Sequence, residues 1–510
     1  MSELSNQRLA KVIADRQPSR VVLFLAALAG LLLAGCAVGP NFHRPAAPTV
    51  GDYTEHPLTT TIATTNIAGG EAQHFTKASD IAGDWWTLFH SQPLNELIEL
   101  ALTNNPDLKA TQAALTVARE NMLAQRGVYY PSVAASFSAS RQKQSDLISP
   151  TPNASIFQYN LFTPQVSISY SPDVFGLNRR TVESVKAQEQ NVRFQMIAAY
   201  TTLTANVVVT AIQSAAVQAQ IDATRQLVNL NSNMVEILRY QYTKGYAGRL
   251  DVVAQESQVA QINATLPPLL KQGAQLRDLL AVLAGRFPNQ SPAGKFELSS
   301  LQLPVEIPVS LPSQLVAQRP DVLQAEANLH AASAQIGIAI ANRLPNITLT
   351  ADAGSTALSF DKLFSSGTGF WELGAAATAP LFQGGTLLHQ ERAAKAAYTQ
   401  AAEQYRSTVL TAFQNVADTL TALEQDAEGL KAAATAADDA QETLGLSQRQ
   451  WKDGYISYLA LLSAEQAYQQ ARINLVQAQA NRYADTAALF QALGGGWWHR
   501  ADLTKDKNEK

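Results

Sequence analysis

The motif Asn105-Pro106-Asp107-Leu108 decides the fold, because it returns 214 residues later as Arg319-Pro320-Asp321-Val322. Two further landmarks return in the same order, at spacings of 214 and 209: Tyr130-Pro131 as Leu344-Pro345, and Lys244-Gly245-Tyr246 as Asp453-Gly454-Tyr455. Landmarks that keep their order with one change of spacing predict that the chain contains one structural unit twice. Unrelated alanine-rich helices that merely look alike are the alternative, and they do not account for the constant spacing.

Each copy follows the same plan of helix, strands and long helical hairpin. A helix of about 23 residues precedes Pro131 or Pro345, and alternating strands follow it. Alanine, glutamine, glutamate and leucine then fill stretches of about 65 residues, which favour helix and span on the order of 100 Å. A glycine-containing break and a returning helix of about 35 residues complete the copy.

This plan divides the chain into six parts. They are a signal peptide at 1–35, an extended segment at 36–92, a first repeat at 93–290, a linker at 291–312, a second repeat at 313–494 and a tail at 495–510. In the first repeat we expect a β-hairpin at about 132–175 and a helical hairpin at about 177–284. In the second repeat we expect them at about 346–380 and at about 386–492.

The expected strands alternate apolar with small polar side chains. In the first copy Val133, Ala135 and Phe137 alternate with serine and alanine, and similar patterns occur at 165–170 and 346–352. The pattern of the fourth expected strand, at 371–378, is weaker because alanine fills it. Such alternation puts one face against an apolar medium, so a soluble sandwich and a membrane barrel both fit it. Strands of about ten residues with hydroxylic polar faces favour the barrel. Because four strands cannot close a barrel, we expect the wall to be shared between two or more chains.

The first 36 residues have the order of a bacterial lipoprotein signal. Basic side chains precede an apolar run at 21–33, which is too short to span a bilayer and ends in Leu33-Ala34-Gly35-Cys36. This ending resembles the lipobox, in which the cysteine is acylated and the peptide is cut before it. We therefore expect Cys36 to carry lipid, and Ala37 after it favours the outer membrane. A lone buried cysteine behind an ordinary signal is the alternative.

Composition excludes several classes of function. One cysteine allows no intrachain disulfide, and without residues 1–35 the 38 basic and 42 acidic side chains fall to 34 and 40, a net charge of −6. That charge argues against a nucleic-acid partner, and no later apolar run matches the length of a membrane-spanning helix. The sequence holds no nucleophile elbow, phosphate loop or dinucleotide fingerprint, and no two histidines stand four residues apart. We therefore expect no enzyme, no catalytic residues, no metal site and no cofactor.

Several short segments together resemble one family. They are Cys36-Ala37-Val38-Gly39-Pro40, Asp84-Trp85-Trp86, Gln318-Arg319-Pro320-Asp321-Val322, Leu381-Phe382-Gln383-Gly384-Gly385 and Leu493-Gly494-Gly495-Gly496-Trp497. Over nearly the whole mature chain the sequence resembles the TolC-type outer-membrane efflux proteins, in the NodT-like lipoprotein subfamily. The resemblance implies a mainly α fold with a β-barrel part and an internal two-fold repeat. It also implies a homotrimer, in which four strands per chain form a twelve-stranded outer-membrane barrel that a long periplasmic α-helical barrel continues.

The function that the resemblance implies is that of an exit duct. Such a duct passively conducts small molecules outward from a periplasmic membrane-fusion adaptor and an inner-membrane RND transporter, without a cofactor. It would lie in the bacterial outer membrane, in contact with its lipid, and extend into the periplasm. Two alternatives stay open: the exit duct of a type I protein-secretion system, and a structural lipoprotein that stiffens the envelope with helical rods. The alternating strands disfavour the rod, which would need none.

The breaks in the two long helices are the candidate contact sites. A glycine there allows the positive φ of a tight reversal, and a plain helix–helix turn is the simpler interpretation. By resemblance, this tip also meets the adaptor, through Gly245, Tyr246, Ala247, Gly248, Arg249 and Leu250 and through Gly454, Tyr455, Ile456, Ser457, Tyr458 and Leu459. Acidic rings close the pore in this family, and the candidates are Asp418, Asp438 and Asp439. Solvated carboxylates on an outer helix face are the alternative for each of them.

Overall fold

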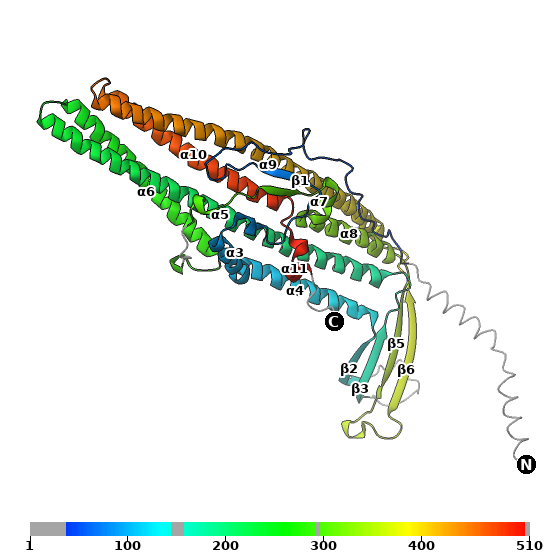
Figure 1. The fold of residues 1–510 in the computed structure, drawn as a ribbon. Coiled ribbons are helices and arrows are strands. Elements are labelled where there is room, and N and C mark those ends of the chain that lie inside the picture. The colour runs from blue at the N-terminus through cyan, green and yellow to red at the C-terminus, as the bar shows by residue number, and fades with distance from the viewer. Residues whose placement is uncertain (1–36, 144–157, 291–295, 505–510) are drawn as a thin grey trace, which may run out of the picture. The chain divides into compact units, whose positions relative to one another are not determined.

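The computed structural model describes residues 37–143, 158–290 and 296–504. The expected signal peptide at 1–35, Cys36 and the last six residues of the expected tail lie outside the described residues. The chain forms two compact units, each assembled from three separate segments (Figure 1). Among the described residues, unit 1 comprises those within 37–44, 117–189 and 327–403, and unit 2 comprises those within 45–116, 190–326 and 404–504.

The two halves of the chain contain helices in the same order. The first half contains α3 (Gln92–Asn104), α4 (Pro106–Arg126), α5 (Leu177–Thr243) and α6 (Arg249–Leu283). The second half contains α7 (Pro312–Gln318), α8 (Pro320–Ala341), α9 (Thr386–Lys452), α10 (Tyr458–Ala492) and the single turn α11 (Ala501–Thr504). Both long helices have 67 residues and both returning helices have 35, so the expected internal repeat is confirmed.

Four strands, two from each half, form one antiparallel sheet in unit 1. Its order is β2 (Ser132–Lys143), β3 (Gln158–Tyr170), β5 (Asn346–Ser355) and β6 (Gly369–Thr378). Directly paired residues of neighbouring strands lie on the same face of a sheet. One row reads Val133, Ile168, Ala351 and Leu373, and the next row reads Ala134, Ser167, Asp352 and Glu372. The expected alternation therefore continues from β2 to β5, and in the alanine-rich β6 the strand pairing assigns the faces.

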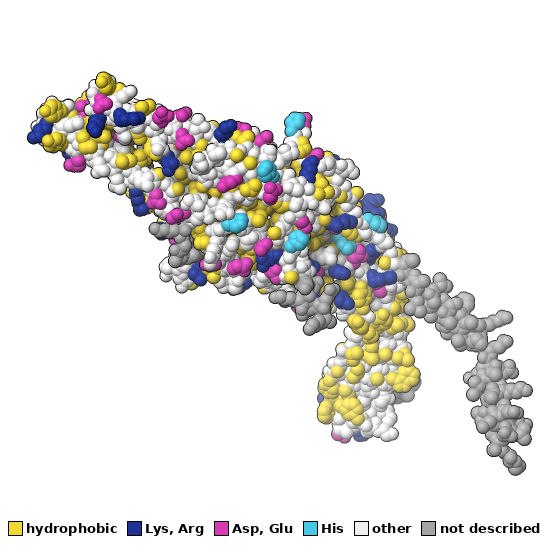
Figure 2. All heavy atoms as spheres, viewed as in Figure 1, with side chains coloured by type: hydrophobic (Ala, Val, Ile, Leu, Met, Phe, Trp, Pro, Cys, Tyr) yellow, Lys and Arg dark blue, Asp and Glu magenta, His cyan; other side chains and the backbone are white. Residues whose placement is uncertain are grey.

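The apolar face of this sheet is exposed. Val133, Phe137, Trp371 and Leu373 are between 56% and 76% exposed. Figure 2 shows hydrophobic side chains gathered over the strands, whereas acidic and basic side chains are scattered over the helices. An exposed apolar surface of this kind marks a contact with a membrane or with another protein.

Residues 45–92, which precede the first repeat, belong to unit 2. Their strand β1 (His74–Lys77) pairs in parallel with β4 (Glu306–Val309) of the linker. Trp85, Trp86 and Phe89 are buried, and Trp85 stacks on Phe490 of α10 with 5.1 Å between the ring centroids. Large aromatic side chains contribute much of the energy of a core, so this cluster stabilises the packing of residues 85–89 against α10.

Helix α5 departs from the expectation that no apolar run has membrane-spanning length. Among the described residues it alone has the length and composition of a spanning helix, with an 18-residue window of mean hydropathy 1.3. In the structure 67% of that window is buried. A helix that packs against several neighbours is apolar on more than one face, and this packing accounts for the composition of α5.

Candidate functional site

The two helical hairpins turn with the same backbone geometry. Gly245 and Gly454 both have a φ of +79°. The Tyr246 N–H donates to the carbonyl oxygen of Gln241 at 2.8 Å, and the equivalent bond from Tyr455 to Gln450 also measures 2.8 Å. These bonds define a Schellman motif, in which the residue of positive φ is usually glycine. A Cβ at either glycine would meet no atom within 4 Å, so the backbone conformation and not the space requires glycine.

Both turns present aromatic and aliphatic side chains to solvent. Tyr246 is 84% exposed, Tyr455 81%, Leu250 71% and Leu459 52%. The other exposed members of the expected contact site are Gly245, Gly248, Arg249, Gly454 and Ser457, while Ala247 and Ile456 are partly buried. Tyr458 differs from them, because it is only 4% exposed and faces the helices. We call Tyr246, Leu250, Tyr455 and Leu459 the tip surface.

A hydrophobic cluster behind the turns joins the two hairpins. It contains Leu238 of α5, Val252 of α6, and Tyr458 and Leu461 of α10. Trp451 of α9 meets the Tyr458 ring with 6.0 Å between the centroids. All four helices therefore contribute to one core, and both turns lie at the same end of unit 2 (Figure 1). The expected contact residues are brought together, except that Tyr458 belongs to the core beneath them.

Polar side chains are buried one turn further along the returning helices. The Gln255 Nε2 of α6 donates to the carbonyl oxygen and to the Oδ1 of Asn231, at 3.0 and 2.9 Å. Glu465 of α10 is 8% exposed, and its Oε2 has no hydrogen-bond partner among the described residues. Burial raises the pKa of Glu465 to about 7, because a carboxyl without a partner keeps its proton more easily than it accepts a buried charge.

Glutamine in place of Glu465 should remove a pH dependence of stability. The folded-state pKa of about 7 exceeds the ordinary value of 4.5, so the wild-type protein loses stability as pH rises from 4.5 towards 7. The neutral amide has no proton to lose in this range. The thermal midpoint of E465Q minus that of the wild type should therefore increase by roughly 5 °C between pH 5 and pH 8. Glu428→Gln, at an exposed position of α9, is the control. An offset that is equal at both pH values would contradict burial as the cause.

The three candidate gate carboxylates are exposed residues of α9. The Asp418 Oδ2 accepts a hydrogen bond from Gln414 at 3.3 Å, and Asp438 and Asp439 are neighbours in sequence. A helical rise of about 1.5 Å per residue separates Asp418 from Asp438 by roughly 30 Å along the helix. The three residues therefore belong to two different levels of α9.

The repeated motif of the sequence has the same task in both copies. In the first copy the Asn105 Nδ2 donates to the carbonyl oxygen of Leu283, at the end of α6, at 3.0 Å. In the second copy the Arg319 Nη1 donates to the carbonyl oxygen of Ala492, at the end of α10, also at 3.0 Å. In both copies the motif thus links the start of a short helix to the end of the returning helix by a hydrogen bond. The sequence predicted the repeat from this motif, but it did not predict this contact.

Arg482 of α10 is a buried residue whose role the local sequence does not indicate. Arg482 is fully buried and donates at 2.7–3.1 Å to the carbonyl oxygens of Gly69, Glu71 and Leu423 and to the Oγ1 of Thr61. Three of these acceptors lie 411–421 residues away in the chain, so no local pattern marks the contact. Burial lowers the pKa of the Arg482 guanidinium, although arginine stays charged in proteins. Arg482 therefore fastens the segment at 61–71 to α9 and α10.

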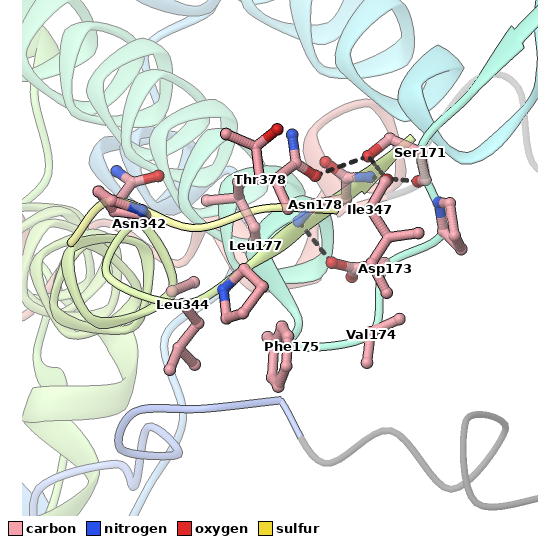
Figure 3. A pocket seen from close by; sticks show the side chains of 15 residues that line it. Ser171, Asp173, Val174, Phe175, Leu177, Asn178, Asn342, Leu344, Ile347 and Thr378 are labelled. Atoms are coloured by element: carbon pink, nitrogen blue, oxygen red, sulfur yellow. Dashed lines mark hydrogen bonds between the residues drawn. The ribbon is translucent and has the colours of Figure 1, made fainter. Parts of the chain in front are cut away.

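A pocket of about 150 Å³ lies where the strands of unit 1 meet its helices (Figure 3). The Asp173 carboxylate accepts the backbone N–H groups of Asn178 and Arg179 at 2.9 and 2.8 Å, which caps the start of α5. The Ser171 Oγ donates to the carbonyl oxygen of Ile347 at 2.9 Å. These short polar contacts fix the direction in which α5 leaves the sheet.

Comparison with known proteins places this geometry in context. The family described as "Outer membrane efflux protein" matches residues 97–286 and 311–495. The chain is 30% identical over 482 residues to the probable efflux pump outer membrane protein TtgC of Pseudomonas putida KT2440, covering 94% of this chain and 96% of that protein. It is 28% identical to the outer membrane protein OprJ of Pseudomonas aeruginosa PAO1, with 92% and 95% covered. The Campylobacter jejuni CmeC outer membrane channel has the same fold, with a TM-score of 0.82, 21% identity, and 92% and 97% covered.

Proposed function

The chain belongs to the outer membrane efflux protein family, and on this premise we propose that three copies form one passive channel across the outer membrane. The family consists of efflux channels, so the protein is the outer-membrane channel of an efflux pump and not an enzyme. The resemblance and the mainly α fold with a four-stranded sheet, both expected from the sequence, are confirmed.

The observation that carries the proposal is the sheet of unit 1. One face, which is exposed, is mainly apolar from β2 to β6, and the opposite face holds mainly serine, threonine and acidic side chains. Strands β2 and β6 are the edges of this sheet, and lipid does not tolerate unpaired edges. Pairing β6 of one copy with β2 of the next would close a wall. Closure needs at least two copies, and the family resemblance supports three, with twelve strands in all.

The tip surface supports a contact with a periplasmic adaptor. Tyr246, Leu250, Tyr455 and Leu459 are exposed apolar residues at the turns, and aromatic residues are enriched in protein interfaces. In this proposal a membrane-fusion adaptor meets the tip, and an RND transporter of the inner membrane supplies the small molecules that the channel conducts. The small hydroxylic side chains of the polar sheet face support weak selection by the channel itself.

A lipid anchor at Cys36 completes the proposal. The apolar run at 21–33 and the ending Leu33-Ala34-Gly35-Cys36 support acylation of the cysteine after cleavage of residues 1–35. The anchor would then assist a protein that already crosses the outer membrane. Labelling of cells with palmitate, followed by purification of the protein, tests this point, and Cys36→Ser is the control that should carry no label.

The channel function itself is tested by conductance. Purified protein should produce stepwise currents in planar bilayers, and deletion of the gene should sensitise cells to small toxic molecules. Alanine at Asp418, or at Asp438 and Asp439 together, should raise the resting conductance if that level of α9 closes the pore. Protein that leaves bilayers non-conducting would overturn the channel in favour of a structural lipoprotein. Lost export of a protein with unchanged sensitivity to small molecules would favour the secretion duct.

Valine in place of Gly245 or Gly454 should abolish efflux while the channel still assembles. Both positions have a φ of +79°, which a β-branched residue avoids strongly, so the turn must change shape. The tip surface would then lose its arrangement, whereas the sheet is not touched. Susceptibility to efflux substrates should approach that of the deletion strain. Gly429→Ala, in the middle of α9 and open to solvent, is the control, and normal efflux in both valine variants would refute the role of the tip.

A further inference from the structure

The first described residues of the chain dock against unit 1. We call residues 37–42 the N-terminal strap. The Val38 N–H donates to the carbonyl oxygen of Phe175 at 3.1 Å, and Phe175 lines the pocket of Figure 3. A Cβ on Gly176 would lie 2.5 Å from the Cα of Ala37, so the two backbones are in close contact. The strap therefore starts at the place where β3 ends and α5 begins.

A buried arginine holds the strap in this position. Arg180 of α5 is 4% exposed. It donates to the carbonyl oxygens of Val38 and Gly39 at 3.1 and 3.3 Å, and to the Asn41 Oδ1 at 2.8 Å. A further bond of 2.8 Å joins it to the Glu183 carboxylate, which balances the buried charge. Three of these four acceptors belong to the strap.

The strap crosses α8 where Gly39 lies against Gly337, so neither segment has a side chain at the crossing. A Cβ on Gly39, whose φ is +90°, would lie 2.4 Å from the Cα of Gly337. A Cβ on Gly337 would lie 2.8 Å from the Arg180 Cγ. Beyond the crossing, Phe42 stacks on His330 with 4.3 Å between the rings, and the His330 Nε2 lies 2.9 Å from the Glu183 Oε1. These contacts fix the position of the strap along α5 and α8.

After the proposed removal of residues 1–35, the strap follows directly on the new N-terminal residue. Terminal residues are usually poorly ordered unless specific contacts fix them. Here a buried guanidinium and a glycine in the interior of α8, a residue type that destabilises a helix relative to alanine, both contact these six residues. The result is a fixed position for the backbone at Ala37, one peptide bond from the cysteine that we propose to be acylated.

We propose that Arg180 is a positioning residue, which holds the strap so that the acyl anchor and the four-stranded sheet share one depth in the membrane. The inference rests on the proposed acylation of Cys36. A free strap of six residues could reach roughly 20 Å, whereas the docked strap brings the anchor to the junction of β3 and α5. The anchor then guides the apolar face of the sheet into the lipid that the acyl chains occupy.

The test measures release of the strap in the assembled protein. Chymotrypsin cleaves after Phe42, which the docked strap keeps stacked on His330, and cleavage frees the palmitate label from the protein. Arg180→Gln and Gly39→Ala act on the two sides of the contact and should each raise the cleavage rate at least about tenfold. The first removes charge-assisted hydrogen bonds, and the second places a Cβ 2.4 Å from the Gly337 Cα at a φ of +90°. Arg180→Lys, which keeps the charge without the planar fork, should fall between them and the wild type.

The controls separate the inference from its premise. Arg225→Gln removes an exposed arginine of α5 and should cleave like the wild type. Native gels report assembly, and if R180Q does not assemble, G39A decides, because its side chain touches only the crossing. Labelled wild-type protein and a wild-type cleavage rate in both variants would overturn the role of Arg180. Wild-type protein without label would overturn the lipid anchor, whatever the cleavage rate.

Discussion

Arginine in place of Phe137 should abolish insertion into the outer membrane, whereas arginine in place of Ser138 should be accepted. Phe137 lies near the middle of β2 and is 56% exposed on the apolar face, while the adjacent Ser138 points to the opposite face. A basic side chain facing lipid at mid-bilayer costs about 2–4 kcal/mol in each chain. The same side chain on the polar face keeps its water.

The measurement is the amount of assembled protein in washed outer membranes. F137R should leave little heat-resistant oligomer there, and S138R should assemble at near wild-type level with altered single-channel conductance. The pair differs by one position in one strand, so expression and export affect both variants alike. Normal assembly of F137R together with loss of S138R would mean that the apolar face is turned inward, and the channel would need a different wall.

Methionine in place of Arg482 should strongly destabilise the protein. The variant keeps an unbranched apolar side chain but removes the guanidinium, which leaves the carbonyl oxygens of Gly69, Glu71 and Leu423 buried without their donor. Removing one partner of such a buried network costs about 3–5 kcal/mol. The loss should appear first as release of the segment at 61–71, because Arg482 is its main polar attachment to α9 and α10.

Two measurements check this expectation. The apparent midpoint of thermal unfolding should fall by roughly 10 °C, and proteases should cut within 61–71 well below that midpoint. Arg472→Met, at a partly buried position of the same helix, should change neither quantity by much. Equal midpoints for R482M and R472M would show that the hydrogen bonds of Arg482 contribute little to stability.

Much of the fold could be predicted from the sequence because its signals are local and occur twice. The long helices lack prolines, Gly245 and Gly454 mark their ends, and the strands alternate with period two. The fourth strand illustrates the limit of such patterns. Its run of alanines at 375–377 carries no alternation, and only the pairing of Leu373 with Ala351 assigns its faces.

The candidate site was predicted less completely, because contacts between distant parts of the chain leave no local pattern. Tyr458 stands among exposed turn residues, yet it is the first residue of α10 and turns into the core. Arg180 and Arg482 look like solvated charges on alanine-rich helices, and their acceptors lie far along the chain. The burial of a residue at the start of a helix cannot be predicted from the local sequence. The same holds for an arginine whose acceptors belong to a distant segment of the chain.

The pairing of β1 with β4 has a consequence for the order of folding. The Gln73 Nε2, next to β1, bonds to Pro304 and Thr486, which follow 231 and 413 residues later. At about 5–20 residues per second, synthesis alone delays the later partner by roughly 20–80 s. Gln73 and β1 thus leave the ribosome long before the residues that complete their native contacts. Until then the edge of β1 is open to wrong partners, so chaperones of the export route should bind most strongly near 60–77.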